Sequence, residues 1–222
     1  QAGEKVKRLS GSDKVEMMYL DMSSVKSIYD FISKLSIANI KFDITILNAG
    51  VALPKARKTD SGLEEMFLVN YLSNVILTNL LIDNKIINLE TDKTFKPRIL
   101  FISSDSHQGS SKIDFDEFGV YMDYGPSKGI ANYSYFKLIL NTYAVELSRR
   151  INKEGVKASV LVICPGPVHS NIVKEAPFLL RVTLKAIFRV IFRSPKKAAL
   201  PVVYMAISPD YEVRTEEHQH LF

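Results

Sequence analysis

The stretch Tyr133-Ser134-Tyr135-Phe136-Lys137, continued by a helical pattern over residues 138–150, organises the rest of this sequence. A tyrosine and a lysine four residues apart on a helix lie on one face, one turn apart. A nearby ammonium group favours the phenolate, so a tyrosine in this position can act as a general acid or base. A single Tyr-x-x-x-Lys pattern is common, and an ordinary pair on a helix surface is the alternative interpretation.

Strands and helices are predicted to alternate around this stretch. Apolar runs predict strands at residues 15–20, 42–47, 98–103 and 156–163, and helices are predicted at residues 1–9, 24–32, 62–82, from about 132, and 196–207. The helix at 24–32 is predicted from apolar residues at positions 25, 28, 29 and 32. This alternation favours a single α/β domain over residues 1–222, a Rossmann-like doubly wound parallel sheet with helices on both faces.

Small or polar residues follow four of the predicted strands. They are Asp21, Asn48-Ala49-Gly50, Ser103-Ser104 and Pro165-Gly166. Each group alone is explained as a turn. Ligands of such sheets bind at the carboxyl ends of the strands, so together the four groups are expected to converge on one crevice.

Composition excludes several classes of protein. The chain has 222 residues, a net charge of +5 and basic residues spread along its length, which argues against a nucleic-acid-binding protein. Its single cysteine, Cys164, excludes an internal disulfide framework and fits a reducing compartment. We find no run of eighteen apolar residues and no signal peptide. His218 and His220 are too few to predict a metal site.

The ordered motifs resemble the short-chain dehydrogenase/reductase family, in its retinol-dehydrogenase-like branch. The resemblance covers Val15 to about Ser208, nearly the whole chain. Its motifs are Leu20-Asp21-Met22-Ser23-Ser24, Leu47-Asn48-Ala49-Gly50-Val51, Val69-Asn70-Tyr71-Leu72-Ser73, residues 98–107 ending in Ser103-Ser104-Asp105-Ser106-His107, Tyr133 with Lys137, and Pro165-Gly166-Pro167-Val168-His169-Ser170.

Two positions require a choice between neighbours. A second pattern, Tyr124-Gly125-Pro126-Ser127-Lys128, also carries the serine that the family usually places before the lysine. Its Gly125, Pro126 and Gly129 oppose a regular helix interior, so Tyr133 is preferred as the family's tyrosine. Phe136 replaces a small residue of the family and is expected to narrow the space beside the cofactor. Of the two serines after the strand, the family uses the second, Ser104.

The resemblance implies a role for each catalytic candidate. Tyr133 would protonate a carbonyl oxygen or take the proton of an alcohol, while Lys137 would lower the pKa of Tyr133 and hold the nicotinamide ribose. Ser104 would hydrogen-bond the substrate oxygen. Asn70 matches the helix asparagine that positions a proton-relay water, and a helix-surface amide is the alternative.

The resemblance also implies a dinucleotide, NADP or NAD with NADP slightly preferred. Asp21 would accept a hydrogen bond from the adenine amino group. The remaining cofactor-binding candidates are Met22, Asn48, Ala49, Gly50, Pro165, Gly166, Val168 and Ser170, in addition to Tyr133 and Lys137. No metal is expected.

The family's opening segment, a strand, a glycine-rich TGxxxGxG turn and a helix, has no counterpart in these 222 residues. In the family this turn cradles the diphosphate. We therefore expect a partial sequence, and a crippled dinucleotide site if the chain is complete. The missing strands would leave the strand at 42–47 without a neighbour and expose an apolar edge. The residue that separates NAD from NADP would also be missing.

Two segments bear on the substrate. The insertion 105–131 is interpreted as part of a substrate mouth, with plain surface elaboration as the alternative. In residues 177–193, Arg181, Lys185, Arg189 and Arg193 recur every four residues among apolar ones. This pattern predicts either a substrate lid with a solvated basic stripe or a helix lying on an anionic membrane. Both imply a hydrophobic substrate.

The sequence therefore predicts an NAD(P)-dependent oxidoreductase that interconverts a carbonyl and an alcohol on a retinoid-, steroid- or lipid-like substrate. The chain is expected in the cytoplasm or peripherally associated with an intracellular membrane, and a homodimer is an open possibility. The rival interpretation is a catalytically inactive relative that binds partners or membranes.

Overall fold

The computed structural model describes residues 2–90, 95–166, 168 and 194–212. Three strands, β1 (Ile44–Leu47), β2 (Arg98–Ile102) and β3 (Ser159–Ile163), form the sheet. The helices are α1 (Ala2–Ser10), α2 (Val25–Ile37), α3 (Glu65–Phe67), α4 (Ser73–Asp83), α5 (Pro126–Ile151) and α7 (Pro195–Ile207), and the shorter turns are η1 (Leu68–Leu72), η2 (Asp105–Gly109) and η3 (Pro209–Tyr211).

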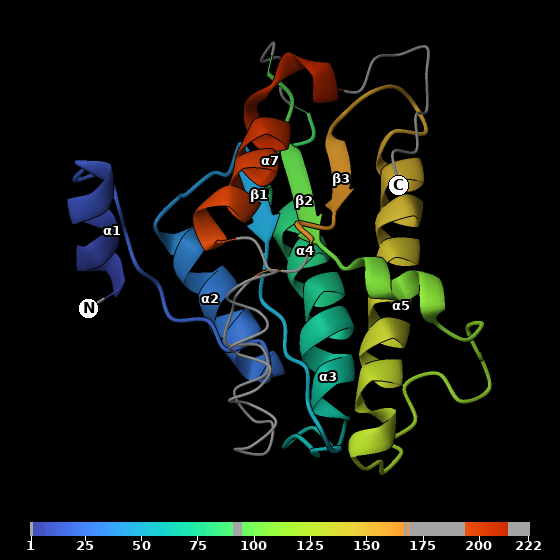
Figure 1. Ribbon diagram of the computed structural model, residues 1–222. Helices are drawn as coiled ribbons and strands as arrows, with labels where there is room; N and C mark the ends of the chain where they lie inside the picture. Colours follow the sequence, from blue (N-terminus) through green and yellow to red (C-terminus); the bar gives the residue numbers. More distant parts are fainter. Residues whose placement is uncertain (1, 91–94, 167, 169–193, 213–222) are drawn as a thin grey trace.

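The sheet is parallel in the order β1-β2-β3 (Figure 1). Leu47 is in register with Phe101, and Phe101 with Val162, so the three strands end at the same level. Parallel strands joined by helices are the βαβ arrangement, and the predicted α/β fold is confirmed.

Alternate residues of the strands face two different cores. Leu47, Ile99 and Phe101 pack with α2, α4 and α5 in the largest buried cluster. On the opposite face Leu100 and Leu161 pack against Met205 and Ala206 of α7. Helices therefore cover both faces, as predicted, because side chains along a strand alternate between the two faces.

The strand predicted at residues 15–20 does not form. Within the described residues this segment pairs with no strand, although its side chains alternate as in one. Met18 and Leu20 pack on the core, whereas Met17 and Tyr19 are 63% and 73% exposed. The prediction was wrong because an apolar alternation fixes which side chains turn inward, while a strand also needs a neighbour for its N–H and C=O groups.

β1 lies at an edge of the sheet, as predicted. In the described part of the chain it pairs with β2 alone, and Ile46 is 44% exposed. On α7 a stripe of Leu200, Val203, Tyr204 and Ile207, each at least half exposed, faces away from the core. The β1 edge and the α7 stripe leave apolar surface uncovered.

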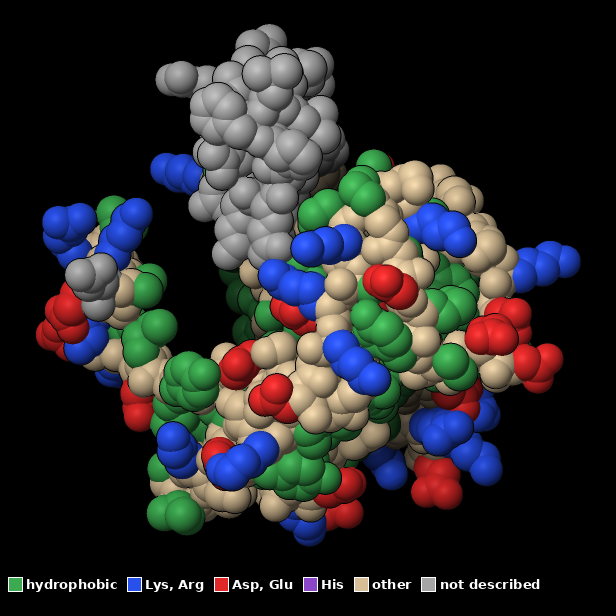
Figure 2. Space-filling view, turned by 90° about the horizontal axis from the view of Figure 1, so that it is seen from below, with side chains coloured by type: hydrophobic (Ala, Val, Ile, Leu, Met, Phe, Trp, Pro, Cys, Tyr) green, Lys and Arg blue, Asp and Glu red, His purple; other side chains and the backbone are tan. Residues whose placement is uncertain are grey.

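The two N-terminal helices lie where the sequence predicts them, but α2 continues to Ile37, beyond its predicted end, and one residue predicted on its apolar face is exposed. α1 ends before Gly11, whose φ of 66° requires the left-handed region. It stands apart from the rest of the molecule (Figures 1 and 2) and buries no residue. α2 begins after Ser24, whose hydroxyl accepts the Ser27 N–H. Tyr29 was predicted on its apolar face but is 53% exposed.

The predicted helix 62–82 is a helical run, Glu65–Asp83, interrupted by the π-helical turn η1. A π-turn inserts one extra residue per turn and so re-aims the side chains that follow it. The run has the length and apolarity of a membrane span, but Val69, Leu77 and Leu81 lie in the core, as in a central helix of a globular domain.

α5 begins at Pro126, about six residues before its predicted start. Proline is favourable at the first position of a helix, where its missing N–H is not needed. α5 packs closely against the segment around Leu53, and Gly129 is the helix residue at this contact. A Cβ at Gly129 would come within 2.6 Å of the Leu53 carbonyl oxygen. The insertion predicted at 105–131 therefore ends near Gly125.

Candidate active site

Tyr133 and Lys137 lie one turn apart on α5, beyond the carboxyl end of β2. Lys137 Nζ is 5.7 Å from the centre of the Tyr133 ring and donates a hydrogen bond to the Ile102 carbonyl at 2.9 Å. The lysine is only 3% exposed. The alternative of an ordinary surface pair is wrong, because Lys137 is buried against the end of the sheet.

Ser104 joins this pair from the end of β2. Its side chain is near enough to Tyr133 to lower the pKa of that phenol, and its hydroxyl accepts the Ser106 N–H at 3.2 Å and donates to Asp105 Oδ1 at 3.4 Å. Ser103 is buried instead, and its hydroxyl has no partner within the described residues. Of the two serines, the structure therefore brings Ser104 to Tyr133.

Burial dominates the protonation of both groups. It raises the pKa of Tyr133 to about 12, against the hydrogen bond of Ser104, which lowers it. The charges of Cys164 and Asp105 raise it further. Burial lowers the pKa of Lys137 to about 8, and Cys164 opposes that shift. The expected lowering of the Tyr133 pKa by Lys137 is not found: burial raises this pKa, since taking either group out of water disfavours its charged form.

Asn70 lies in the π-turn and is fully buried. Its amide is fixed by two hydrogen bonds of 2.8 Å, one from the Val51 N–H to Oδ1 and one from Nδ2 to the Val51 carbonyl. A Cβ added to Gly50 would lie 3.3 Å from Asn70 Oδ1 and 3.7 Å from Lys137 Nζ. The helix-surface alternative for Asn70 is wrong, and Gly50 brings the backbone after β1 to both side chains.

The second pattern, Tyr124 to Lys128, is built differently. Tyr124 precedes α5, is buried, and donates its phenol proton to Glu64 Oε1 at 2.8 Å. Burial, and then this carboxylate, raise its pKa. Lys128 is exposed on the first turn of α5. The structure therefore places Tyr133, and not Tyr124, one helical turn from a buried lysine, although the helix starts earlier than predicted.

Several cofactor-binding candidates surround the same edge. Asn48, Ala49 and Gly50 are exposed directly after β1. Pro165 and Gly166 follow β3, and Gly166 adopts a φ of 76° that favours glycine. Val168 is partly buried, and Ser170 lies outside the described residues, as do 177–193, His218 and His220.

Asp21 and Met22, two further cofactor-binding candidates, both bond other residues of the chain. The Asp21 carboxylate accepts hydrogen bonds from the N–H and hydroxyl of Ser23. Met22 packs its side chain in the core, and its carbonyl accepts the Ser73 hydroxyl at 2.6 Å. Only the backbone of Met22 is therefore positioned to meet a ligand.

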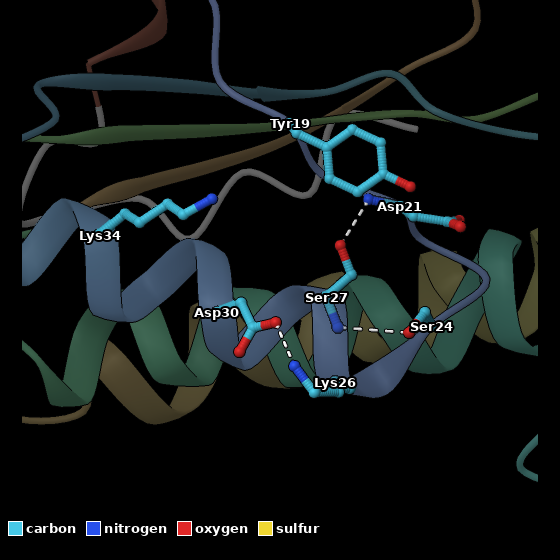
Figure 3. Close-up of a pocket in the computed structure, with 7 residues that line it drawn as sticks. All are labelled: Tyr19, Asp21, Ser24, Lys26, Ser27, Asp30 and Lys34. Carbon is cyan, nitrogen blue, oxygen red and sulfur yellow. Dashed lines mark hydrogen bonds and ion pairs between the residues drawn. The ribbon is translucent and has the colours of Figure 1, made fainter.

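A pocket of about 190 Å³ lies along α2, remote in sequence from Tyr133. Its lining residues are Tyr19, Asp21, Ser24, Lys26, Ser27, Asp30 and Lys34. Figure 3 shows the Asp21 carboxylate turned away from Asp30 and Lys34, and Lys26 forms an ion pair with Asp30. None of Tyr133, Lys137, Ser104 and Asn70 lines this pocket, so it is not the candidate active site.

Two residues at the site were given no role by the sequence. Cys164 accepts the Asp105 N–H at 3.2 Å and interacts electrostatically with Tyr133 and Lys137. His107 bonds the Ser104 carbonyl through Nδ1 at 2.6 Å. The position of Cys164 directly after β3, and of His107 in the turn that follows β2, is the signal that could have found them. Among the described residues, no three His, Cys, Asp or Glu side chains form a group that could hold a metal.

The sequence is similar to several named dehydrogenases. Human polyprenol dehydrogenase is 31% identical over 96% of this chain and 62% of its own length. Human retinol dehydrogenase 13 is 32% identical over 88% of this chain and 57% of its own, and mouse retinol dehydrogenase 14 is 33% identical over 87% and 55%. This chain therefore spans less than two thirds of the length of these relatives. No family model matches it.

Solved structures show the same fold at lower identity. A Pseudomonas aeruginosa RhlG/NADP complex superposes with a TM-score of 0.67 at 19% identity, over 96% of this chain and 78% of that one. An oxidoreductase of the short-chain dehydrogenase/reductase family from Burkholderia thailandensis gives 0.65 at 16%, over 96% and 75%. The relatives and the fold together support a member of the short-chain dehydrogenase/reductase family, in its retinol-dehydrogenase-like branch.

Proposed function

We propose that this chain is the catalytic part of a nicotinamide-dependent oxidoreductase that interconverts a carbonyl and an alcohol. One observation carries the proposal: at the carboxyl edge of the sheet Tyr133 interacts with the Ser104 side chain, and its ring lies 5.7 Å from the Lys137 ammonium. Three groups that donate or accept protons, brought together from β2 and α5, suit the exchange of a proton with a substrate oxygen.

Each residue then has a defined task. In the reduction Tyr133 donates its phenol proton to the carbonyl oxygen, and in the oxidation it takes the proton of the alcohol. With a pKa of about 12 it is a phenol at neutral pH, the form that donates. Ser104 hydrogen-bonds the same oxygen and stabilises the negative charge that develops there. Asn70 fixes the backbone at Val51 beside the site.

The residues present fit the nicotinamide end of a dinucleotide. Gly50 leaves open the space that a Cβ would fill beside Asn70 and Lys137, and the exposed backbone of 48–50 borders it. Lys137, whose Nζ borders this space, would hold the ribose. The nicotinamide would supply or accept the hydride. The structurally similar RhlG of Pseudomonas aeruginosa forms a complex with NADP, which supports NADP slightly before NAD.

A hydrophobic substrate is supported by the names of the relatives. Polyprenol and retinol are both long apolar alcohols. The aromatic side chains Phe67, Tyr71, Phe118 and Phe136, next to Tyr133 and Tyr135, form an apolar cluster beside the site. Phe136 belongs to this cluster, so in our proposal it borders the substrate. The proposed peripheral membrane contact rests on residues 177–193, outside the described residues.

The test is Tyr133→Phe in the protein as its source makes it, with Tyr124→Phe as the matched control. Loss of the general acid should lower kcat/KM for an apolar aldehyde or alcohol by about 100- to 10,000-fold. Tyr124→Phe should leave kcat/KM of the folded protein within about threefold, since that phenol bonds Glu64 away from the lysine. Unchanged hydride transfer by Tyr133→Phe would overturn the mechanism.

The rival, an inactive relative that serves as a binding protein, is favoured by the lack of a glycine-rich turn within the 222 residues. Fluorescence titration with NADPH and NADH separates the two. Saturable binding supports the oxidoreductase. Absence of binding, together with absence of turnover, would leave the inactive relative as the better description.

A further inference from the structure

The turn that follows Ser104 is held together at the Ser104 carbonyl. Ser104 caps η2, and the backbone N–H of His107 reaches its carbonyl only at 3.4 Å. The imidazole Nδ1 of His107 reaches the same oxygen at 2.6 Å. The ring therefore makes the short hydrogen bond that a regular helical turn would obtain from the backbone.

The Ser104 carbonyl determines which ring nitrogen of a neutral His107 carries the proton. A carbonyl oxygen can only accept, so the proton of a neutral His107 must lie on Nδ1, leaving Nε2 as an acceptor. The protonated ring donates from Nδ1 as well. The bond to Ser104 thus persists in either charge state of His107.

Ser104 depends on this turn because it lies beyond the sheet. β2 ends at Ile102, and the Ser103 N–H donates to the Ile163 carbonyl at 2.8 Å. After that point Ser104 is held by its own turn, where its hydroxyl accepts the Ser106 N–H. The Asp105 N–H, donating to Cys164, ties the turn to the end of β3.

The Ser104 hydroxyl is also the group that meets Tyr133. Its Oγ accepts the Ser106 N–H and donates to Asp105 Oδ1 at 3.4 Å, so residues of this turn hold the hydroxyl from both sides. A shift of this turn would move the hydroxyl relative to both Tyr133 and the substrate oxygen. Misplacement by about 1 Å can lower a rate about 100-fold.

We propose that His107 is a positioning residue, whose Nδ1–H holds the Ser104 carbonyl and thereby keeps the Ser104 hydroxyl opposite Tyr133. The proposal rests on the proposed oxidoreductase function and adds a residue that touches neither substrate nor cofactor.

Three substitutions of His107 distinguish the roles of its two ring nitrogens. They are made in the full protein, as its source produces it. In His107→Asn the side-chain amide takes the place of Nδ1, in His107→Gln it takes the place of Nε2, and His107→Phe keeps the ring without a donor. We expect Phe and Gln to lower kcat by about 10- to 100-fold with KM within about threefold. Asn should restore kcat to within about threefold of the wild type. Equal kcat for Asn and Gln would contradict a role of Nδ1.

A double-mutant cycle shows whether His107 acts through Ser104. In a Ser104→Ala background the hydroxyl to be positioned is gone, so His107→Phe should lower kcat by less than about twofold. A merely structural role would give the full loss in both backgrounds. Independently of turnover, nitrogen-15 NMR of the labelled ring should find the neutral form protonated at Nδ1, and protonation at Nε2 would overturn the proposal.

Failure of this inference is distinguishable from failure of the proposed function. If Tyr133→Phe abolishes turnover while His107→Phe and His107→Gln behave as the wild type, only the role of His107 is wrong. If Tyr133→Phe retains full turnover, the proposed mechanism fails first.

Discussion

The same tyrosine–lysine spacing occurs twice in this chain, nine residues apart, and only one copy forms a site. Tyr133 and Lys137 both lie inside α5, at the level where the strands end. Tyr124 and Lys128 lie on either side of the start of the helix, so the phenol turns to Glu64 and the ammonium to solvent. Spacing sets a common face only when both residues belong to one helix, and the position of that helix decides what the face meets.

The largest expected effect compares the two lysines. Lys137→Met should lower kcat/KM by about 100-fold, because the ammonium beside Tyr133 and the ribose is lost. Lys128→Met, on the exposed first turn, should leave kcat/KM within about twofold. Steady-state kinetics with an apolar aldehyde and NADPH measures both. Similar losses of kcat/KM in the two variants would show that the two tyrosine–lysine pairs do not differ in function.

The pH dependence of stability should also separate the lysines. The pKa of Lys137 falls from 10.5 in the unfolded chain to about 8 in the fold, so the unfolded state binds more protons between these values. At pH 7 burial of the ammonium costs about 3 kcal/mol, and its bond to Ile102 returns about 1. Lys137→Met should therefore raise the free energy of unfolding by about 2 kcal/mol at pH 7.

This gain should shrink as the pH rises from 8 toward 10.5, because the wild-type lysine becomes neutral and its desolvation penalty disappears. Urea unfolding at several pH values, with Lys128→Met as the control, measures it. A gain that does not change over this interval would show that the ammonium is not desolvated.

A smaller effect distinguishes the two phenols. Tyr124→Phe removes the hydrogen bond to Glu64, a side chain that is 5% exposed, and should lower the free energy of unfolding by about 1.5 kcal/mol. Tyr133→Phe, at the open edge of the sheet, should change stability by less than about 0.5 kcal/mol. Urea unfolding that ranks the two variants in the opposite order would contradict these assignments.

The smallest effect concerns the glycine after the second pattern. Gly129→Ala places a Cβ against the Leu53 carbonyl, and the crowding, about 2 kcal/mol, exceeds the roughly 1 kcal/mol gained in helix propensity. The net loss of stability should be about 1 kcal/mol. Ile130→Ala, at a residue 80% exposed, is the control and should change little. A stabilised Gly129→Ala variant would show that α5 yields at this contact.

Sequence patterns predicted much of the fold because the largest core depends on them. The three strands of the sheet and the apolar face of α2 at Ile28 and Ile32 follow from local signals. The start of α5 was predicted late because glycine and proline were taken as helix breakers, whereas Pro126 suits a first turn and Gly129 suits a close contact. Both exceptions depend on where in the helix the residue lies.

The candidate site, like the fold, was predictable from the sequence only in part. Spacing selected Tyr133 and Lys137, and the family resemblance selected Ser104 and Asn70. The structure brings these residues together at the carboxyl edge of the sheet. The clamp of Asn70 on Val51 links residues 19 apart, and the contact of Asp105 with Cys164 links residues 59 apart. No periodicity of the sequence encodes contacts over such separations.

By itself the sequence determined the alternation of strands and helices and the face shared by Tyr133 and Lys137, since both follow from regular local geometry. The tertiary structure alone decided that residues 15–20 form no strand, that burial raises the pKa of Tyr133 and lowers that of Lys137, and that His107 holds Ser104. The physical reason is that pairing, desolvation and hydrogen bonding depend on which neighbours surround a group in space, and distant parts of the chain supply those neighbours.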